Sequence, residues 1–354
     1  MTVVLGIETS CDETSVALVA DGEKVLANAV ASQSALHRAY GGIVPEIACR
    51  AHTAALLPAL ETALGKAGLK LDQVDAIAAT HAPGLVGSLL VGLTAGKTLA
   101  WTLGKPFVAV NHLAAHLHAT HMADPAGAYP AATLLASGGH TAIYFSREPG
   151  THEAVGRTVD DAAGEAFDKA AKILELGYPG GPEIDRLAAT GNPRAIPFPV
   201  GRGAGPYDFS FSGLKTAVLY KCRGPRGADP LTLSPTERAD VAASFQEAVV
   251  TALVQRTMAA ARGLGAASVR ISGGVACNRR LRAAMGEAAA KAGMAFVCPP
   301  PSLCTDNAAM VAGLGGLLLA RDGGSPLETD AFARMEGPLA GRRFTAAGAR
   351  TTKS

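Results

Sequence analysis

Two histidines four residues apart, His112 and His116, have the residue type and spacing that most directly suggest chemistry. Because an α-helix turns once in about 3.6 residues, both imidazoles can face one point and bind one metal ion. In zinc proteases a Glu follows the first His and acts as general base, but here that position is Leu113. The pattern therefore allows a metal site and disfavours peptide hydrolysis. A merely His-rich helix is the alternative, since His118 and His121 follow.

A third ligand for such a metal is available late in the chain. Asp306 directly precedes an apolar segment, residues 307–320, which is predicted to be helical. The default interpretation of a carboxylate at a helix start is an N-cap. The alternative is a third ligand that faces His112 and His116, which would give a two-histidine, one-carboxylate set with open coordination positions.

Two glycine loops could hold a phosphate or a nucleoside, because no side chain keeps a ligand away from their backbone. Ser137-Gly138-Gly139 lies between two predicted strands, although a plain turn would have the same composition. The loop 272–278 follows a strand and opens a helix near Asn278, where a helix N-terminus favours anions and a plain N-cap is the alternative. Gly96-Lys97-Thr98 resembles the end of a P-loop but lies inside a predicted helix, so we reject it.

The elements that must position these residues follow a repeated plan. Residues 3–31 and 131–159 each predict three successive strands, the first set containing an Asp21-Gly22 hairpin turn. Helices and strands then alternate after each copy, which predicts mainly parallel strands covered by helices. The expected helices are 51–64, 86–103, 112–121, 162–176, 240–262, 279–292 and 307–320, and the expected further strands are 76–79, 107–110, 268–271 and 295–298. Residues 177–236 interrupt the second copy and predict loops and short helices.

Length and composition describe a globular chain of two domains. The sequence has 354 residues, 48% hydrophobic residues and a net charge of +2, so no strong overall field points to nucleic acid. The six cysteines form no C-x-x-C pair, and we interpret them as reduced thiols of a cytoplasmic protein. The first residues predict a strand rather than a signal peptide, and no uncharged apolar run reaches membrane-spanning length.

The motifs resemble, in their order along the chain, those of the TsaD family of bacterial tRNA threonylcarbamoyladenosine transferases. These proteins were long misnamed sialoglycoprotein endopeptidases. The resemblance covers roughly residues 3–340. The motifs that carry it are the segments 8–14, 83–89, 112–116, 137–141, 160–169, 178–182, 209–215 and 273–278.

The resemblance implies an α/β protein of the actin/Hsp70/sugar-kinase fold, with two ribonuclease-H-like lobes and a cleft between them. We expect residues 1–111 and 307–345 in the N-terminal lobe and residues 112–306 in the C-terminal lobe, the latter with the insertion at about 177–236. Residues 346–354 are expected to be a disordered tail.

The activity implied by the resemblance is an acyl transfer to tRNA. The family moves the L-threonylcarbamoyl group from threonylcarbamoyl-AMP to N6 of adenine 37 in tRNAs that read codons beginning with A, and AMP is released. The implied cofactor is one divalent ion, with Fe²⁺ favoured over Zn²⁺, held by His112, His116 and Asp306. The implied partners are tRNA, TsaB, TsaE and the upstream enzyme TsaC, with no membrane. A homodimer and a TsaB heterodimer are both left open.

The resemblance also implies a set of substrate-binding residues. These fall on Leu135, Ala136, Ser137, Gly138, Gly139, Asp168, Gly181, Asp185 and Asn278.

This sequence departs from the family's pattern at two places. Many members have Glu-Gly where this chain has Ala114-Ala115, and a Gln is frequent at the position of Ala142. The ligand spacing is kept, so metal binding is still expected.

Other functions also suit these residues. A carbamoyltransferase for a small acceptor would have nearly the same site, and a non-catalytic scaffold of the modification complex is a further alternative. A sugar or acetate kinase would share the fold without needing the two histidines. Two basic clusters are candidates for tRNA contact, or else solvated surface: Arg279, Arg280 and Arg282, and Lys221, Arg223 and Arg226.

Overall fold

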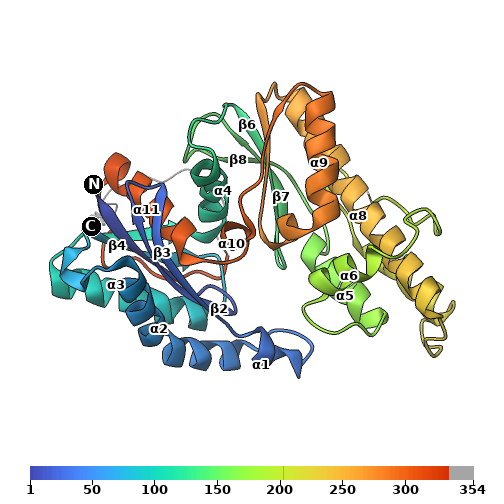
Figure 1. Ribbon diagram of the computed structural model, residues 1–354, viewed down its shortest axis with the longest axis horizontal. Helices are drawn as coiled ribbons and strands as arrows, with labels where there is room; N and C mark the ends of the chain where they lie inside the picture. The colour runs from blue at the N-terminus through green and yellow to red at the C-terminus, as the bar shows by residue number, and fades with distance from the viewer. Residues whose placement is uncertain (202, 335–354) are drawn as a thin grey trace, which may run out of the picture.

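A computed structural model describes residues 1–201 and 203–334 and contains two five-stranded sheets, one in each half of the molecule (Figure 1). The first sheet has the order β3-β2-β1-β4-β5 and the second β10-β9-β6-β7-β8. In both, three antiparallel strands are followed by two parallel ones. The predicted repeat is therefore confirmed. The strands of the first sheet are β1 (Val3–Glu8), β2 (Glu13–Ala20), β3 (Lys24–Ser32), β4 (Ala76–Ala82) and β5 (Phe107–Asn111). Those of the second are β6 (Ala131–Ala136), β7 (Thr141–Ser146), β8 (Glu153–Arg157), β9 (Ser268–Ser272) and β10 (Ala295–Val297).

Helices cover both faces of the first sheet, which explains why β1 is apolar from Val3 to Ile7 instead of alternating. Leu5 and Ile7 pack towards α2 (Pro45–Ala67) and α3 (Val86–Leu103), whereas Val4 packs towards α4 (His112–Ala123) and α11 (Ala308–Asp322). Gly6 allows the last of these contacts, because a Cβ there would lie 2.4 Å from the Ala308 carbonyl oxygen. The start of α11 can therefore lie directly on the backbone of β1.

The second sheet is covered by the remaining long helices. These are α5 (Ala163–Ile173), α6 (Gly180–Ala188), α7 (Ser212–Arg223), α8 (Pro235–Gly263) and α9 (Arg279–Lys291). The short elements are α1 (Ser34–Arg38), α10 (Pro301–Cys304) and the 3₁₀ turns η1 (Leu71–Gln73) and η2 (Gly274–Cys277). Helices α4 and α10 lie between the two halves, and α4 contacts strands of both sheets (Figure 1). A residue on α4 is therefore at the junction of the molecule.

Most predicted elements are confirmed with small changes at their ends. The hairpin turn has positive φ at both Asp21 (52°) and Gly22 (75°), as a two-residue turn of this kind requires. Helix α2 begins at Pro45, six residues earlier than predicted, and runs through Pro58. Helix α8 begins at Pro235, where Ser234 and Glu237 form a capping box. The P-loop-like tripeptide lies inside α3, so its rejection is confirmed.

The insertion at 177–236 is an integral part of the second half. It contains α6 and α7, and a bridge joins Thr158 to Phe209. Phe209 and Phe211 are fully buried in the core of the second half and stack on each other. The prediction of loops and short helices is confirmed. The lobe boundaries stay a prediction, and the tail at 346–354 lies outside the described residues.

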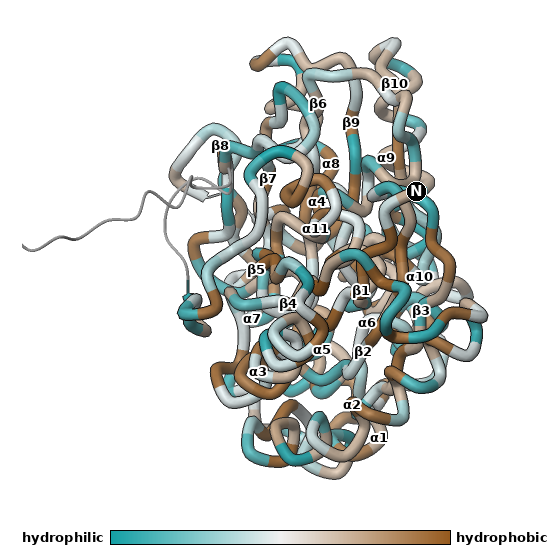
Figure 2. The backbone as a smooth tube through the Cα atoms, turned by 90° about the vertical axis from the view of Figure 1, so that its left-hand side faces the viewer, coloured by the Kyte–Doolittle hydropathy of each residue, from teal (hydrophilic) through white to brown (hydrophobic). Residues whose placement is uncertain are grey.

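One helix, α3, is long and apolar enough to cross a membrane by length and composition alone. It carries Lys97, and its buried side contributes Leu89 and Leu93 to the core of the first half. In Figure 2 the tube of α3 is not uniformly hydrophobic. We interpret α3 as a core helix.

A buried histidine, His152, lies between β7 and β8. Its Nδ1 is 2.7 Å from the Ser146 hydroxyl, and its Nε2 has no hydrogen-bond partner among the described residues. Burial, together with the nearby charges of His118, Arg321 and Arg270, lowers the pKa of His152 to about 3. The folded protein therefore holds this imidazole neutral.

Candidate metal centre

His112 and His116 begin helix α4, directly after strand β5. Asn111 caps the helix, its side-chain oxygen accepting a hydrogen bond of 3.0 Å from the Ala114 amide. One helical turn brings the two rings together, with centroids 4.7 Å apart. Both side chains are buried. The prediction that both imidazoles share one face is therefore confirmed.

Asp306, which lies between α10 and α11, faces the two histidines. Its Oδ1 is 3.0 Å from His116 Nε2 and 3.6 Å from His112 Nε2. The three ligand atoms all lie within 4.8 Å of one another. The default interpretation of Asp306 as an N-cap is wrong, because Asn307 caps α11 by accepting from the Met310 amide at 3.1 Å. The Asp306 carboxylate is thereby left for the histidines.

A buried carboxylate, Glu8, fixes the orientation of His112. Glu8 Oε2 is 3.0 Å from His112 Nδ1 and accepts a hydrogen bond of 2.7 Å from Thr80 Oγ1, while Oε1 accepts from the Ser10 amide at 2.6 Å. If Nδ1 donates to Glu8, the Nε2 lone pair is presented to the site, which is the arrangement typical of metal-bound histidine. His116 Nδ1, by contrast, is buried without a partner among the described residues.

The charges of the site reinforce one another. Burial acts to lower the pKa of His112, but the carboxylates of Glu8 and Asp306 outweigh it and raise the pKa to about 9. Burial acts to raise the pKa of Asp306, but His112 and then His116 hold it well below its usual range. Two imidazoles and an ionised carboxylate form a donor set that suits Fe²⁺ or Zn²⁺. The residues present therefore fit a divalent ion, whose binding would displace the His112 proton.

Leu113 takes no part in this chemistry. It packs against an apolar cluster formed by Leu117, Leu135, Ala142 and Tyr144. The position that carries the general base of zinc proteases is thus used for packing. This packing role of Leu113 disfavours peptide hydrolysis at the site.

The loop Ser137-Gly138-Gly139 forms a tight turn between β6 and β7. The Ser137 amide donates to the His140 carbonyl at 2.8 Å, so that amide is already used. A Cβ on Gly138 or Gly139 would meet nothing within 4 Å, and their amides donate to no protein acceptor within the described residues. Open space in front of free amides is what an anion or a polar group needs.

The second glycine loop lies beside the first. Gly273 has φ of +89°, and a Cβ there would lie 2.3 Å from the Ala136 carbonyl oxygen, so only glycine fits. Leu135 and Ala136 themselves are fully buried in β6, which leaves only their backbone for a ligand. Both loops follow the carboxyl ends of the neighbouring parallel strands β6 and β9. Ligands of open α/β sheets bind at this edge.

Three of the remaining predicted substrate residues lie on α6 or beside it. Asp168 on α5 accepts a hydrogen bond of 2.7 Å from the Gly180 amide, and burial, followed by the charges of Asp12 and Glu165, raises its pKa. A Cβ on Gly181 would stand in open space. Asp185 forms an ion pair of 2.7 Å with Arg279.

Asn278 caps helix α9. Its side-chain oxygen accepts from the Leu281 amide at 2.9 Å, and its amide nitrogen donates to Gln246 at 2.7 Å. The N-cap interpretation is therefore confirmed. Its role towards a substrate stays a prediction, as it does for the other residues of this set.

The sequence did not identify Glu8, Glu13 or His140 as parts of the site. Burial, with the charges of Asp306 and Asp12, raises the pKa of Glu13 to about 9, so this carboxyl is protonated at neutral pH. Burial, with the charges of His112 and His116, lowers the pKa of His140 to about 4. Glu8 and Glu13 lie in the segment 8–14 and His140 in the segment 137–141, and both segments had been singled out without a role for these side chains.

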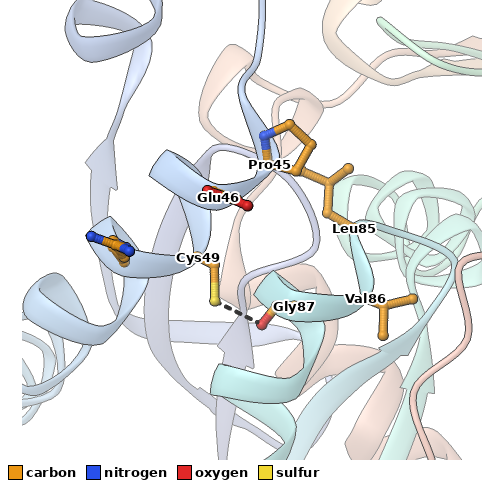
Figure 3. A pocket seen from close by; sticks show the side chains of 7 residues that line it. Pro45, Glu46, Cys49, Leu85, Val86 and Gly87 are labelled. Carbon is orange, nitrogen blue, oxygen red and sulfur yellow. Dashed lines mark hydrogen bonds between the residues drawn. The ribbon is translucent and has the colours of Figure 1, made fainter.

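A separate hollow of about 410 Å³ opens where α2 and α3 begin (Figure 3). It is lined by Pro45, Glu46, Cys49, Arg50, Leu85, Val86 and Gly87, and the Cys49 thiol donates to the Gly87 carbonyl at 3.3 Å. It contains none of the predicted site residues.

The repeated sheets and the glycine loops at their strand ends define a protein of the actin/Hsp70/sugar-kinase class. Solved structures show the same fold. Component A of the (R)-2-hydroxyglutaryl-CoA dehydratase of Acidaminococcus fermentans has a TM-score of 0.54 at 14% identity, covering 91% of this chain and 100% of its own. HypF of T. kodakarensis has a TM-score of 0.58 at 16% identity, covering 90% of this chain and 48% of its own.

Sequence relatives identify the family within this class. The sequence profile described as TsaD, tRNA N6-adenosine threonylcarbamoyltransferase, matches residues 24–313. The protein of that name from Symbiobacterium thermophilum is 52% identical over 314 residues, which is 88% of this chain and 90% of the relative. The one from Nostoc sp. is 48% identical over 342 residues, 95% and 97% of the two chains. The chain belongs to the TsaD family of tRNA threonylcarbamoyltransferases, and the expected fold and enzyme class are confirmed.

Proposed function

We propose that this protein transfers the L-threonylcarbamoyl group of threonylcarbamoyl-AMP to N6 of adenine 37 in tRNAs that read codons beginning with A, releasing AMP. The observation that carries the proposal is that helix α4, which bears His112 and His116 of the His-His-Asp set, contacts strands β6 and β9, whose ends lead into the two glycine loops. The His-His-Asp set suits a divalent ion, and the glycine loops suit an acyl-nucleotide.

The donor is a mixed anhydride and is already activated, so the protein must position it and stabilise charge on its oxygens. His112, His116 and Asp306 would hold the ion, with Fe²⁺ favoured and Zn²⁺ the alternative. When bound, the ion supplies Lewis-acid polarisation of donor oxygens.

The protein's own groups would bind and orient the donor. The free amides of Gly138 and Gly139 would donate to the phosphate or the threonyl carboxylate. Asp168, held by the Gly180 amide, would accept from a ribose hydroxyl. Leu135 and Ala136 would contribute backbone only. Glu13, protonated at neutral pH, is not available as a general base there.

Binding of the tRNA would depend on more than the basic clusters of this chain. Arg279 and Arg280 are paired with Asp185 and Glu247, and Arg282 donates to the carbonyls of Ala276 and Pro299. Arg223 is paired with Glu175. These pairs reduce the charge available for phosphates. We therefore propose that partner proteins, TsaB and TsaE, complete the tRNA site, that TsaC supplies the donor, and that the complex acts in the cytoplasm.

Mass spectrometry of tRNA nucleosides tests the activity. The tRNA is incubated with ATP, threonine, bicarbonate and the partner proteins, and threonylcarbamoyladenosine is quantified. His112→Ala should abolish the product, whereas His121→Ala, on the same helix but beside Glu23, should retain it. Product formed by the His112→Ala protein would contradict the proposal. Transfer to a small acceptor instead of tRNA would favour the alternative carbamoyltransferase.

A further inference from the structure

Arg282 on helix α9 joins two segments that belong to different parts of the proposed site. Its Nε donates to the Ala276 carbonyl at 2.5 Å, and its Nη2 donates to the Pro299 carbonyl at 3.1 Å. The same Nη2 lies 3.5 Å from the Cys304 sulfur. Ala276 lies in η2, at the second glycine loop, whereas Pro299 precedes α10 and Cys304 ends it. One guanidinium group therefore holds the glycine loop and the segment that leads to Asp306.

The other two arginines at the start of α9 have different partners. Arg279 pairs with Asp185 at 2.7 Å, and Arg280 pairs with Glu247 at 2.8 Å. Arg282 forms no ion pair within residues 1–201 and 203–334, and its hydrogen bonds go to backbone carbonyls instead. Because the donors of a guanidinium group form a rigid fork, a fork bound to two separate segments fixes those segments relative to each other.

The short helix α10 connects this fork to the metal centre. Helix α10 contacts both η2 and α4, the helix of the two proposed histidine ligands (Figure 1). It ends at Cys304, two residues before Asp306, whose Oδ1 lies 3.0 Å from His116 Nε2. A single helical turn does not hold its own position, so contacts from outside must place it. Arg282 fixes the chain before Asp306, as Asn307 fixes the chain after it by capping α11.

We propose that Arg282 is a positioning residue that holds Asp306 and the second glycine loop in one arrangement. A nucleoside bound in the loop orders η2, and the contacts of Arg282 pass this order on to α10 and Asp306. Less ordering is then left for a metal ion to impose, so the nucleoside and the metal ion strengthen each other's binding. This role rests on the proposed function, because it takes the loop as a nucleoside site and the His-His-Asp set as a metal site.

Zinc titration with and without adenosine tests this role. Full-length protein is stripped of metal and titrated with Zn²⁺ against a chromophoric chelator, alone and with saturating adenosine, whose own binding is measured by calorimetry. Adenosine carries no phosphate to bind the ion directly, so a change in zinc affinity passes through the protein. In the wild type, adenosine should strengthen zinc binding about five-fold or more, which is typical of coupled sites.

Two substitutions remove the fork in different ways. Arg282→Ala removes the whole group, whereas Arg282→Lys keeps the positive charge but lacks the fork that reaches Ala276 and Pro299 together. Both variants should bind zinc about ten-fold more weakly, and adenosine should no longer change that affinity. Arg280→Ala, on the same helix but paired with Glu247, should keep the zinc affinity and the coupling. Thermal unfolding of the stripped proteins identifies a variant that does not fold, and the other variant then carries the test.

Each other result counts against a defined step. A folded Arg282→Ala or Arg282→Lys protein with wild-type zinc affinity would overturn the positioning of Asp306 by the guanidinium fork. Zinc affinity that adenosine leaves unchanged in the wild type, or strengthens equally in the variants, would overturn the coupling. A wild-type protein that binds no zinc would instead refute the proposed metal site, and one that binds no adenosine would refute the proposed nucleoside site.

Discussion

Replacing Glu8 by Gln should weaken metal binding about 10- to 100-fold without unfolding the protein. Glu8 is fully buried, and its Oε2 lies 3.0 Å from His112 Nδ1. A hydrogen bond to a charged group contributes about 1.5–3 kcal/mol, which corresponds to this range of affinity. Gln has nearly the same shape and keeps an acceptor for the Ser10 amide. Its amide group, however, can donate to His112 Nδ1, which would place the ring proton on Nε2 and block the ligand atom.

The assay is a titration of metal-stripped protein with Zn²⁺ or Fe²⁺ against a chromophoric chelator. The matched control is Glu23→Gln, because Glu23 is 3.6 Å from His121 of the same helix and about half exposed. The control should change the affinity less than about two-fold, in keeping with the weak effect of exposed pairs. Thermal unfolding of the stripped proteins shows whether the variant is folded. A folded Glu8→Gln protein with wild-type affinity would refute the role assigned to Glu8.

Three further predictions concern stability. His152 has a pKa of about 3 in the folded protein and about 6.5 in the unfolded chain, so the free energy of unfolding is undiminished above about pH 6.5 and falls as the pH falls. The loss at pH 5 is about 2 kcal/mol. Denaturant unfolding of His152→Gln should show a weaker pH dependence than the wild type. Gly273→Ala should lower the free energy of unfolding by more than about 1 kcal/mol in the same assay, because Gly273 has a φ of +89° and the new Cβ would meet the Ala136 carbonyl. Its control, Gly274→Ala, has open space around the new Cβ and should change the free energy of unfolding by less than about 0.5 kcal/mol. A metal ion at 100 times its dissociation constant should stabilise the folded protein by about 2.7 kcal/mol. This stabilisation is measured as a higher melting temperature, which a chelator should reverse and which the Asp306→Ala protein should not show.

The repeated strands were predictable because their signals are local. Runs of apolar residues bounded by turn residues, such as Asp21-Gly22, specify strands and hairpins without help from distant parts of the chain. The glycine-rich and proline-rich segment 177–236 was harder, and α6 and α7 were expected only as unspecified short helices. Their positions depend on tertiary contacts, such as the Gly180 amide on Asp168 and the burial of Phe211. Propensity gives no signal for such contacts.

The metal centre likewise has a part that could be predicted from local sequence and a part that depends on tertiary contacts. His112 and His116 are four residues apart, so helix geometry alone brings them together. Asp306 joins them only because α11 lies on the backbone of Gly6, and because Asn307 takes the cap that the sequence had favoured for Asp306.

Glu8 reaches His112 across 104 residues of chain, through the pairing of β1 with β4 and of β4 with β5. No local sequence pattern predicts such a contact. The sequence could therefore identify which residues are able to bind a metal, but not which residue holds a ligand in the required orientation. Since an unsupported imidazole in a buried site can adopt either tautomer, that second property decides whether the two histidines act as ligands or as packing residues.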